Sequence, residues 1–360
     1  MDGNEPMQDM ADALRDGAQR WIEGAFPRAR RAACIAGEEG AAEAVWRDLA
    51  DMGMMGLMVP EAAGGLGAGA TVMCRVAEAF GHGLMSEPWI PVAVGAVSIL
   101  SDAGRDLTAL GAGTTRPVPA WIEPDRRWCR RPSATLIDGS GCISGTKTVV
   151  WGASLADTVL VSALDSSGAE VIARVSAEEI IRKPYRMWDG CDAAELVFRA
   201  APAEILLDGS PASSALDRAL DLMTLAICAE ALGAMARALD LTREHLRTRV
   251  QFGRPLAANQ ALRHRVAEAW VEADLARALI TRVAREFEKY DAAGRRRMTA
   301  AAKAQTGAAA RRMAEETVQM HGGIGITDDA EISHLHRRLV AIDLSFGSTA
   351  VQVASFRGGE

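Results

Sequence analysis

The stretch that decides the fold is SALDRALDLMTLAICAEALGAMARAL, residues 214–239. Apolar residues recur in it every three or four positions, which is the spacing of one buried helix face. Ser214 and Asp217 have the spacing of a capping box, so we expect the helix to begin at Ser214. The buried face is marked by Leu216, Leu220, Met223, Ile227, Ala231, Met235 and Leu239. The pattern predicts a long helix packed on one side.

Three further helices follow this one. The long helix itself should stop near Gly253, because glycine and the proline after it end a helix. Asn259 can cap the second, and an alanine-rich third helix runs from about Met298 to the Gly322-Gly323 pair. Long helices with short connections pack as an antiparallel bundle. We therefore predict a C-terminal four-helix bundle over residues 208–360.

The sequence before the bundle changes character twice. Residues 1–116 show helical periodicity and end in glycine-rich loops, which predicts an N-terminal helical domain. Residues 117–207 contain short β-branched runs separated by turn signals, such as CISGTKTVV and DTVLVSAL. Several short strands in about ninety residues predict a small β-barrel or sandwich. The expected fold class is α+β, with a central β domain between two helical parts.

Composition excludes several classes of function. The 360 residues carry a net charge of −7, which gives no reason to expect a nucleic-acid partner. The six cysteines form no CxxC pair, and His334 and His336 are two apart, so no metal site is expected. The N-terminus lacks an apolar signal segment, and the most apolar run, Trp89–Leu100, is shorter than a membrane span. We expect a cytoplasmic protein without a membrane partner.

Three motifs, in order along the chain, resemble those of the acyl-CoA dehydrogenase family. They are LADMGMMGLMVPEAAGGLGAG (residues 49–69), RTRVQFGRPLAANQAL (247–262) and VQMHGGIGIT (318–327). The order of helical, β and bundle segments also matches that family. Each motif alone would be weak, but three at sensible spacing are a strong signal.

The resemblance implies FAD as the cofactor, and one set of flavin-binding residues is intact. In the family, the Arg-x-x-Phe-Gly and Gln-x-x-Gly-Gly motifs face the flavin of a neighbouring subunit. A guanidinium can pair with a pyrophosphate, and glycines let backbone amides approach closely. The cofactor-binding residues carried over to this chain are Arg249, Gln251, Phe252, Gln319, Gly322, Gly323 and Ser348.

The residues that would hold a flavin within the same subunit match poorly. The family's Thr-Glu-Pro loop, which continues to Gly-Ser-Asp, reads WIEPDRRW here, so Ile122 replaces the threonine and Gly-Ser-Asp is lost. The Trp-x-Thr strand motif beside the flavin ring reads KTVVWGA, which places Val149 and Trp151 at those positions. Together these changes suggest that the β domain does not cradle a flavin in the usual way.

The family's catalytic base is also missing. The base is a glutamate that removes the proton α to the thioester carbonyl, so it needs a carboxylate within hydrogen-bond reach. The usual position falls on Phe346, and the alternative position on the long helix falls on Met223. Asp221 and Glu230 are near the latter but out of register. We therefore assign no catalytic residue to this chain.

The combined pattern resembles the small subunit of heteromeric acyl-CoA dehydrogenases, of the pimeloyl-CoA dehydrogenase type, found also in bacterial steroid side-chain degradation. It implies a heterotetramer in which a larger homologous subunit supplies the glutamate. An acyl-CoA substrate and electron-transfer flavoprotein as acceptor follow from the family. One alternative is a self-sufficient flavoenzyme, either a dehydrogenase with a relocated base such as Asp343 or a flavin monooxygenase. Another is a flavin-free structural subunit.

Overall fold

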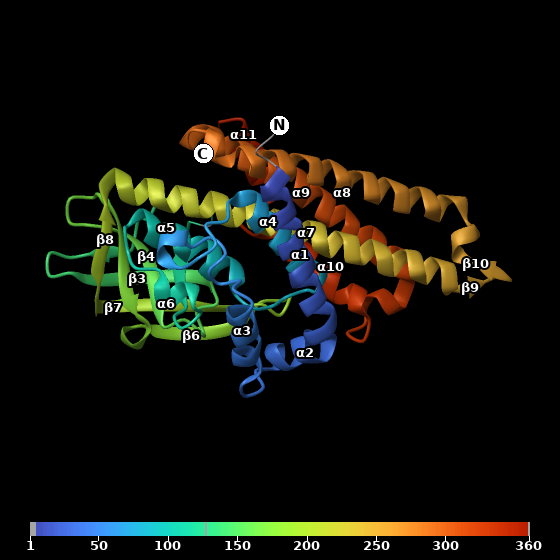
Figure 1. Ribbon diagram of the computed structural model, residues 1–360, viewed down its shortest axis with the longest axis horizontal. Coiled ribbons are helices and arrows are strands. Elements are labelled where there is room, and N and C mark those ends of the chain that lie inside the picture. Colours follow the sequence, from blue (N-terminus) through green and yellow to red (C-terminus); the bar gives the residue numbers. More distant parts are fainter. Residues whose placement is uncertain (1–4, 127, 359–360) are drawn as a thin grey trace. The chain divides into compact units, whose positions relative to one another are not determined.

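The computed structural model describes residues 5–126 and 128–358 in two compact units (Figure 1). Of the described residues, the helical unit combines 5–27, 70–85 and 224–358. The strand unit combines residues 28–69 and 86–223. The first four residues of the N-terminal segment and Arg127, within the WIEPDRRW loop, lie outside the described residues.

The helical unit contains the predicted bundle together with two helices from the N-terminal part of the chain. Its helices are α1 (Glu5–Ala25), α4 (Ala70–His82), the second half of α7 (Gly209–Thr248), α8 (Gln260–Glu286), α9 (Ala292–His321), α10 (Glu331–Leu344) and α11 (Thr349–Phe356). A two-stranded hairpin, β9 (Val250–Gln251) and β10 (Arg254–Pro255), joins the ends of α7 and α8 (Figure 1). Helix α9 packs against α8, α10 and α11.

Helix α7 is buried on all sides over most of its length, since every residue from Ala219 to Met235 is buried. A glycine pair lets it cross α4 backbone to backbone. A Cβ at Gly233 would lie 1.8 Å from the carbonyl oxygen of Glu78, and a Cβ at Gly81 would lie 1.9 Å from that of Glu230. No residue other than glycine fits at either position without moving the helices apart. This contact fixes the distance between α4 and α7.

The strand unit is built around one sheet. Its strands are β1 (Pro117–Ala120), β2 (Leu136–Ile137), β3 (Cys142–Trp151), β4 (Thr158–Leu164), β5 (Glu170–Ser176), β6 (Ile181–Arg186), β7 (Asp192–Pro202) and β8 (Glu204–Asp208). The order is β6-β7-β3-β2-β4-β5-β8, with β1 parallel to β4. Its helices are α2 (Arg28–Ala36), α3 (Ala41–Asp51), a π-helix (Ile90–Ala96), α5 (Val97–Asp102), α6 (Thr108–Gly111) and the start of α7.

A buried ion pair anchors the loop after β1 to the sheet. The Nζ atom of Lys147, on β3, lies 3.1 Å from Oε1 of Glu123 and neither side chain is exposed by more than 4%. Backbone amides of the 133–135 segment also donate to the Glu123 carboxylate. Burial alone would raise the pKa of Glu123, but the ammonium of Lys147 and the hydrogen bonds outweigh it and lower the pKa to about 2.

The α+β fold class is confirmed, but several details differ from the prediction. The sheet is open, with β6 and β8 at its edges, so it is not a closed barrel. Helix α7 begins at Gly209 rather than at Ser214, so the capping box was wrong. Asp217, assigned to that box, instead pairs with Arg130. The predicted cap of α8 is confirmed, because Asn259 accepts a hydrogen bond from Ala261 N at 3.0 Å. The three domain boundaries stay predictions.

Two helical stretches, 209–248 and 331–356, have the length and composition of a membrane span. Neither stretch is an uninterrupted apolar run, so the expectation drawn from apolar runs in the sequence did not include them. In the first, 94% of the most apolar window is buried within the protein, as in the core helix of a bundle. The second is broken between Leu344 and Thr349, where α10 ends and α11 begins, and only 33% of its window is buried.

We predict that Glu123→Gln destabilises the protein by roughly 3–5 kcal/mol, because it leaves the Lys147 ammonium buried without its counter-charge. The measurement is the free energy of unfolding in urea. The double variant Glu123→Gln/Lys147→Met removes both charges and should recover part of the loss. Equal costs for the single and double variants would contradict the role assigned to the pair.

Candidate cofactor site

The Arg-x-x-Phe-Gly motif forms the β9–β10 hairpin at the end of α7. Phe252 and Gly253 both have left-handed backbones, with φ of 51° and 77°, as a two-residue hairpin turn requires. This turn points the Phe252 side chain outward, where it is 99% exposed. Arg249 and Gln251 are exposed as well. The amide of Leu256 donates to the carbonyl of Arg249 at 2.9 Å and closes the base of the hairpin.

The Gln-x-x-Gly-Gly motif lies at the end of α9. Gln319 is exposed in the last turn, and Gly322 ends the helix with a φ of 69°, a conformation that favours glycine. Gly323 follows at the start of a short 3-10 helix, η6 (Gly322–Ile326). Nothing lies within 4 Å of a Cβ built on Gly323, so the backbone there is open to a neighbouring group.

Two histidines bring these motifs to the same end of the helical unit. The rings of His245, on α7, and His321, on α9, stack with centroids 4.5 Å apart and planes 25° apart. His245 lies one turn before Arg249, and its carbonyl accepts the Arg249 amide at 2.9 Å. His321 lies directly before Gly322. The predicted residues of the two motifs are thus neighbours in space as well as in family pattern.

The exposed groups at this end fit the phosphate part of a dinucleotide. Among the described residues, no acidic group pairs with Arg249, and the same holds for Arg247, Arg254 and Arg263 nearby in sequence. Unpaired guanidinium groups, an exposed amide at Gln319 and open glycine backbone are the donors that bind phosphate oxygens. The donors at this end of the helical unit therefore have the chemistry that phosphate oxygens require.

Phe346 occupies a strained turn between α10 and α11. Its backbone is left-handed, with a φ of 55°, which costs a non-glycine residue on the order of 1 kcal/mol. The turn is held by Lys303 of α9, whose buried Nζ donates to the carbonyls of Asp343 at 2.9 Å and Gly347 at 3.2 Å. The amide of Gln352 donates to the Phe346 carbonyl. The left-handed backbone of this turn is a conformation common at functional sites, whereas its side chain is a buried phenyl ring.

Ser348 is not part of the cluster formed by the other six predicted cofactor residues. It stands at the N-terminus of α11, half-buried, and its hydroxyl makes no capping bond. The turn packs against Gly307 of α9, where a Cβ would lie 2.6 Å from Oγ1 of Thr349. Gly307 is 14 residues before His321, or about 21 Å along the helix. Ser348 therefore belongs to the Phe346 turn.

The carboxylates near the two base positions are engaged in ion pairs. Asp343, the candidate for a relocated base, is buried and lies 2.9 Å from Nη2 of Arg311. It also accepts the Thr349 hydroxyl at 2.7 Å. Glu230 is held at 2.6 Å and 2.8 Å by the guanidinium of Arg338. Both carboxylates therefore already have cationic partners within the chain.

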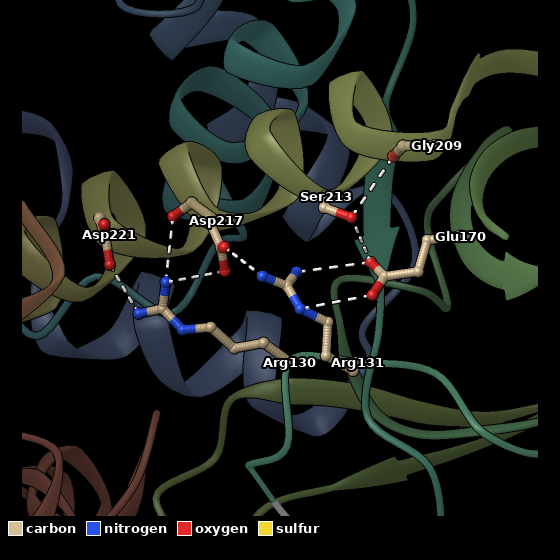
Figure 2. Close-up of polar contacts among 7 residues, drawn as sticks. All are labelled: Arg130, Arg131, Glu170, Gly209, Ser213, Asp217 and Asp221. Atoms are coloured by element: carbon tan, nitrogen blue, oxygen red, sulfur yellow. Dashed lines mark hydrogen bonds and ion pairs between the residues drawn. The ribbon is translucent and has the colours of Figure 1, made fainter. Parts of the chain in front are cut away.

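Met223, at the alternative base position, fills its site with an apolar side chain. It is 1% exposed, and its Sδ would lie 2.4 Å from a Cβ built on Gly95 of the π-helix. Asp221, two residues earlier, points to Arg130, whose Nη2 lies 2.6 Å from Oδ1 of Asp221 (Figure 2). The strand unit therefore offers no unpaired carboxylate at this position.

The loop that should hold a flavin within the chain is fastened by ion pairs instead. Arg130 and Arg131 reach the first turns of α7, where Asp217 contacts both (Figure 2). Arg131 also lies 3.4 Å from Glu170. Ile122 is buried, and Val149 has a left-handed backbone with a φ of 51° at an irregularity of β3. Ile122 and Trp151 stand at the threonine positions of the two family motifs, and neither supplies a hydroxyl.

Sequence reasoning missed the residues that organise the site. His245 carried no motif signal, because its role comes from the stacking partner on another helix. The Arg130–Asp221 and Arg131–Asp217 pairs were missed for the same reason, since their partners are about ninety residues apart in sequence. The only signal was local: charged residues in an apolar helix, which require a partner when they are buried.

Comparison with known proteins agrees with the fold described above. Residues 8–106 match the family model for the N-terminal domain of acyl-CoA dehydrogenases, and residues 213–356 match that for the C-terminal domain. The chain is 28% identical over 310 residues to the acyl-CoA dehydrogenase FadE27 of Mycobacterium tuberculosis, covering 82% of each chain. The chain belongs to the acyl-CoA dehydrogenase family, whose members are flavoprotein oxidoreductases.

Two solved structures are similar over nearly the whole chain. A variant of the Tcur3481–Tcur3483 steroid acyl-CoA dehydrogenase has a TM-score of 0.89 at 26% identity, with 98% of each chain covered. The ChsE4–ChsE5 complex of Mycobacterium tuberculosis has a TM-score of 0.87 at 23% identity, covering 97% of this chain and 96% of the other. The second likeness shows the fold alone.

We predict that Arg338→Met destabilises the protein by roughly 3–5 kcal/mol, because it leaves the buried Glu230 carboxylate unpaired. Arg237→Met is a matched control on the same two helices, since Arg237 pairs with Glu331 at 2.6 Å but both side chains are about one-third exposed. That control should cost no more than about 1 kcal/mol. Similar losses in urea unfolding for the two variants would show that Glu230 does not depend on its partner.

Proposed function

We propose that this chain is the non-catalytic subunit of a heteromeric, FAD-dependent acyl-CoA dehydrogenase. It completes the FAD site of a larger homologous subunit, which supplies the catalytic glutamate for α,β-dehydrogenation of an acyl-CoA thioester. The cofactor is shared across the subunit boundary, with Arg249 and Gln319 on the phosphate side. Electron-transfer flavoprotein is the proposed acceptor, and the cytoplasm the proposed location.

The observation that carries the proposal is an asymmetry between two sets of residues. The set that faces outward is complete, exposed and gathered by the His245–His321 stack; it consists of Arg249, Gln251, Phe252, Gln319, Gly322 and Gly323. The set that would serve this chain's own flavin has lost its hydroxyls, and both base positions are apolar. Keeping the first set has a physical use only if a flavin is bound by another chain.

The surface around the outward-facing set supports a protein partner. Large apolar side chains are exposed beside it, namely Val250, Phe252, Trp270, Leu275, Ile324 and Ile326. Next to them, α7 and α8 form a groove of about 640 Å³. Its lining includes Leu239, Leu246, Val266 and Trp270, with Arg243 and Arg263 at charged positions. Apolar surface of this kind, rimmed by charge, is typical of a protein interface.

The similar structures support the choice of a homologous partner. Two of them, ChsE4–ChsE5 and Tcur3481–Tcur3483, are known as a complex or a pair of chains, and the second is described as a steroid enzyme. We propose by analogy that this chain also works beside a related chain, and that a steroid side chain or a fatty acyl group is the substrate class. This step rests on likeness of fold and sequence.

Two other functions make different predictions. A self-sufficient dehydrogenase would use Asp343 as its base, but that carboxylate is paired with Arg311 and hydrogen-bonded to Thr349. A flavin monooxygenase of the same fold needs no such base and should bind FAD alone. A flavin-free structural subunit has no need for the exposed Arg249.

We predict that the isolated chain purifies with little FAD, and that co-expression with a full-length homologous subunit yields a yellow complex with about one FAD per pair of chains. The measurement is flavin absorbance together with subunit stoichiometry. An isolated chain that holds stoichiometric FAD as a homo-oligomer would overturn the proposal.

We also predict that Arg249→Ala weakens FAD binding by the complex by roughly tenfold or more, because a charge-assisted hydrogen bond to phosphate contributes about 1.5–3 kcal/mol. FAD affinity is measured by fluorescence titration of the deflavinated complex. Arg285→Ala, an exposed arginine in the last turn of α8, is the control and should leave affinity unchanged. A structural subunit would show no effect of either substitution.

A further inference from the structure

The stacked pair His245–His321 is the contact that holds the two outward-facing motifs together. Its rings are nearly parallel, and each ring is half-buried. The Nδ1 atom of His321 lies 2.8 Å from the carbonyl of Thr317, so it must carry the proton that is donated. His245 immediately precedes the turn that carries Arg249. The pair therefore sits between the guanidinium and the glycines of the candidate site.

The surroundings of the pair disfavour the protonated form of both rings. Burial lowers the pKa of His245, and the charged form of His321 and the guanidinium of Arg249 lower it further. Burial also lowers the pKa of His321, against a smaller opposite effect of the Thr317 carbonyl.

Charges on the neighbouring elements are paired with one another rather than with these rings. Arg265 of α8 lies 3.4 Å from Glu316 of α9. Asp328, in the turn after η6, lies 2.8 Å from Arg337 of α10. Glu316 and Asp328 therefore each have an arginine as ion-pair partner.

We propose that the His245–His321 stack is a pH-sensitive latch on the candidate cofactor site. With both rings neutral, the stack holds the last turn of α7, from which the β9–β10 hairpin leaves, against the end of α9. When the rings gain protons, two imidazolium groups and Arg249 are brought together, and the hairpin is released. The latch regulates the site assigned above, so its biological meaning rests on the proposed function.

The direction of the effect follows from proton linkage. A base whose pKa is lowered in the closed state binds fewer protons closed than open. The closed state is therefore most favoured above the ordinary titration range of histidine, and the advantage is lost as the pH falls through that range. We expect a closed site at pH 7.5 and a loosened one at pH 5.5.

The test uses the isolated full chain and requires neither FAD nor a partner. Amide hydrogen exchange is measured at Leu256, whose N–H closes the hairpin by donating to Arg249, at pH 7.5 and 5.5 with correction for the intrinsic exchange rate. We expect protection to fall by at least about fivefold at the lower pH, the lower end of ordinary coupling between sites. Unchanged protection would overturn the latch.

Two variants separate proton binding from simple packing. His245→Phe and His321→Phe each keep a stacked ring but remove one titratable group, so the loss of protection at pH 5.5 should shrink. His334→Gln is the control, because His334 is bonded to the carbonyl of Asp328 away from the stack. A pH effect of the same size in the phenylalanine variants would refute the proposal.

If a phenylalanine variant does not fold, the native chain still decides the question. The imidazole protons of His245 and His321 are titrated by NMR, and both should titrate below the ordinary range. Titration of both in the ordinary range overturns the latch. A flavin-free complex with a working latch would refute the proposed function alone, so the two failures are distinct.

Discussion

Gly81 of α4 and Gly233 of α7 allow two helices to touch through their backbones, and the packing of the helical unit depends on this contact. The same crossing contains Glu230, whose carbonyl rests against Gly81 while its carboxylate reaches Arg338 of α10. One residue therefore links three helices. Any larger side chain at the glycines would separate α4 from α7 and expose a buried ion pair to water.

Buried ion pairs explain why a chain rich in acidic residues has no obvious base. Asp221, Glu230 and Asp343 all lie near positions where the family would place a catalytic glutamate, yet each is paired with an arginine. Each pair fixes a helix or loop in place. The left-handed backbone at Phe346 lies in a turn held by the buried ammonium of Lys303, which donates to the carbonyls of Asp343 and Gly347.

The residues expected at a flavin site fall into two groups, one facing the chain itself and one facing outward. Residues that would serve the chain itself have become apolar or structural, while residues that face outward remain polar and exposed. The outward-facing residues also stand beside exposed aromatic and aliphatic side chains. The exposed guanidinium groups and the apolar side chains beside them are the features on which the proposed partner interface rests.

The sequence by itself determined the order of helical, β and bundle segments and the cap at Asn259, whereas the cofactor-binding role of the two outward-facing motifs stays a prediction. It could do so because periodicity, turn residues and short motifs are local properties of the chain. It did not place the start of α7, the open sheet or strands such as β6 and β8, because strand pairing and helix ends depend on distant partners.

The tertiary structure alone decided which of these residues meet. The His245–His321 stack, the Arg130–Asp221 pair and the separation of Ser348 from the rest of the site join or divide residues far apart in sequence. Such contacts carry no periodic signal, since each partner is an ordinary residue of its own helix or loop. Their energies arise only when folding removes water from between them.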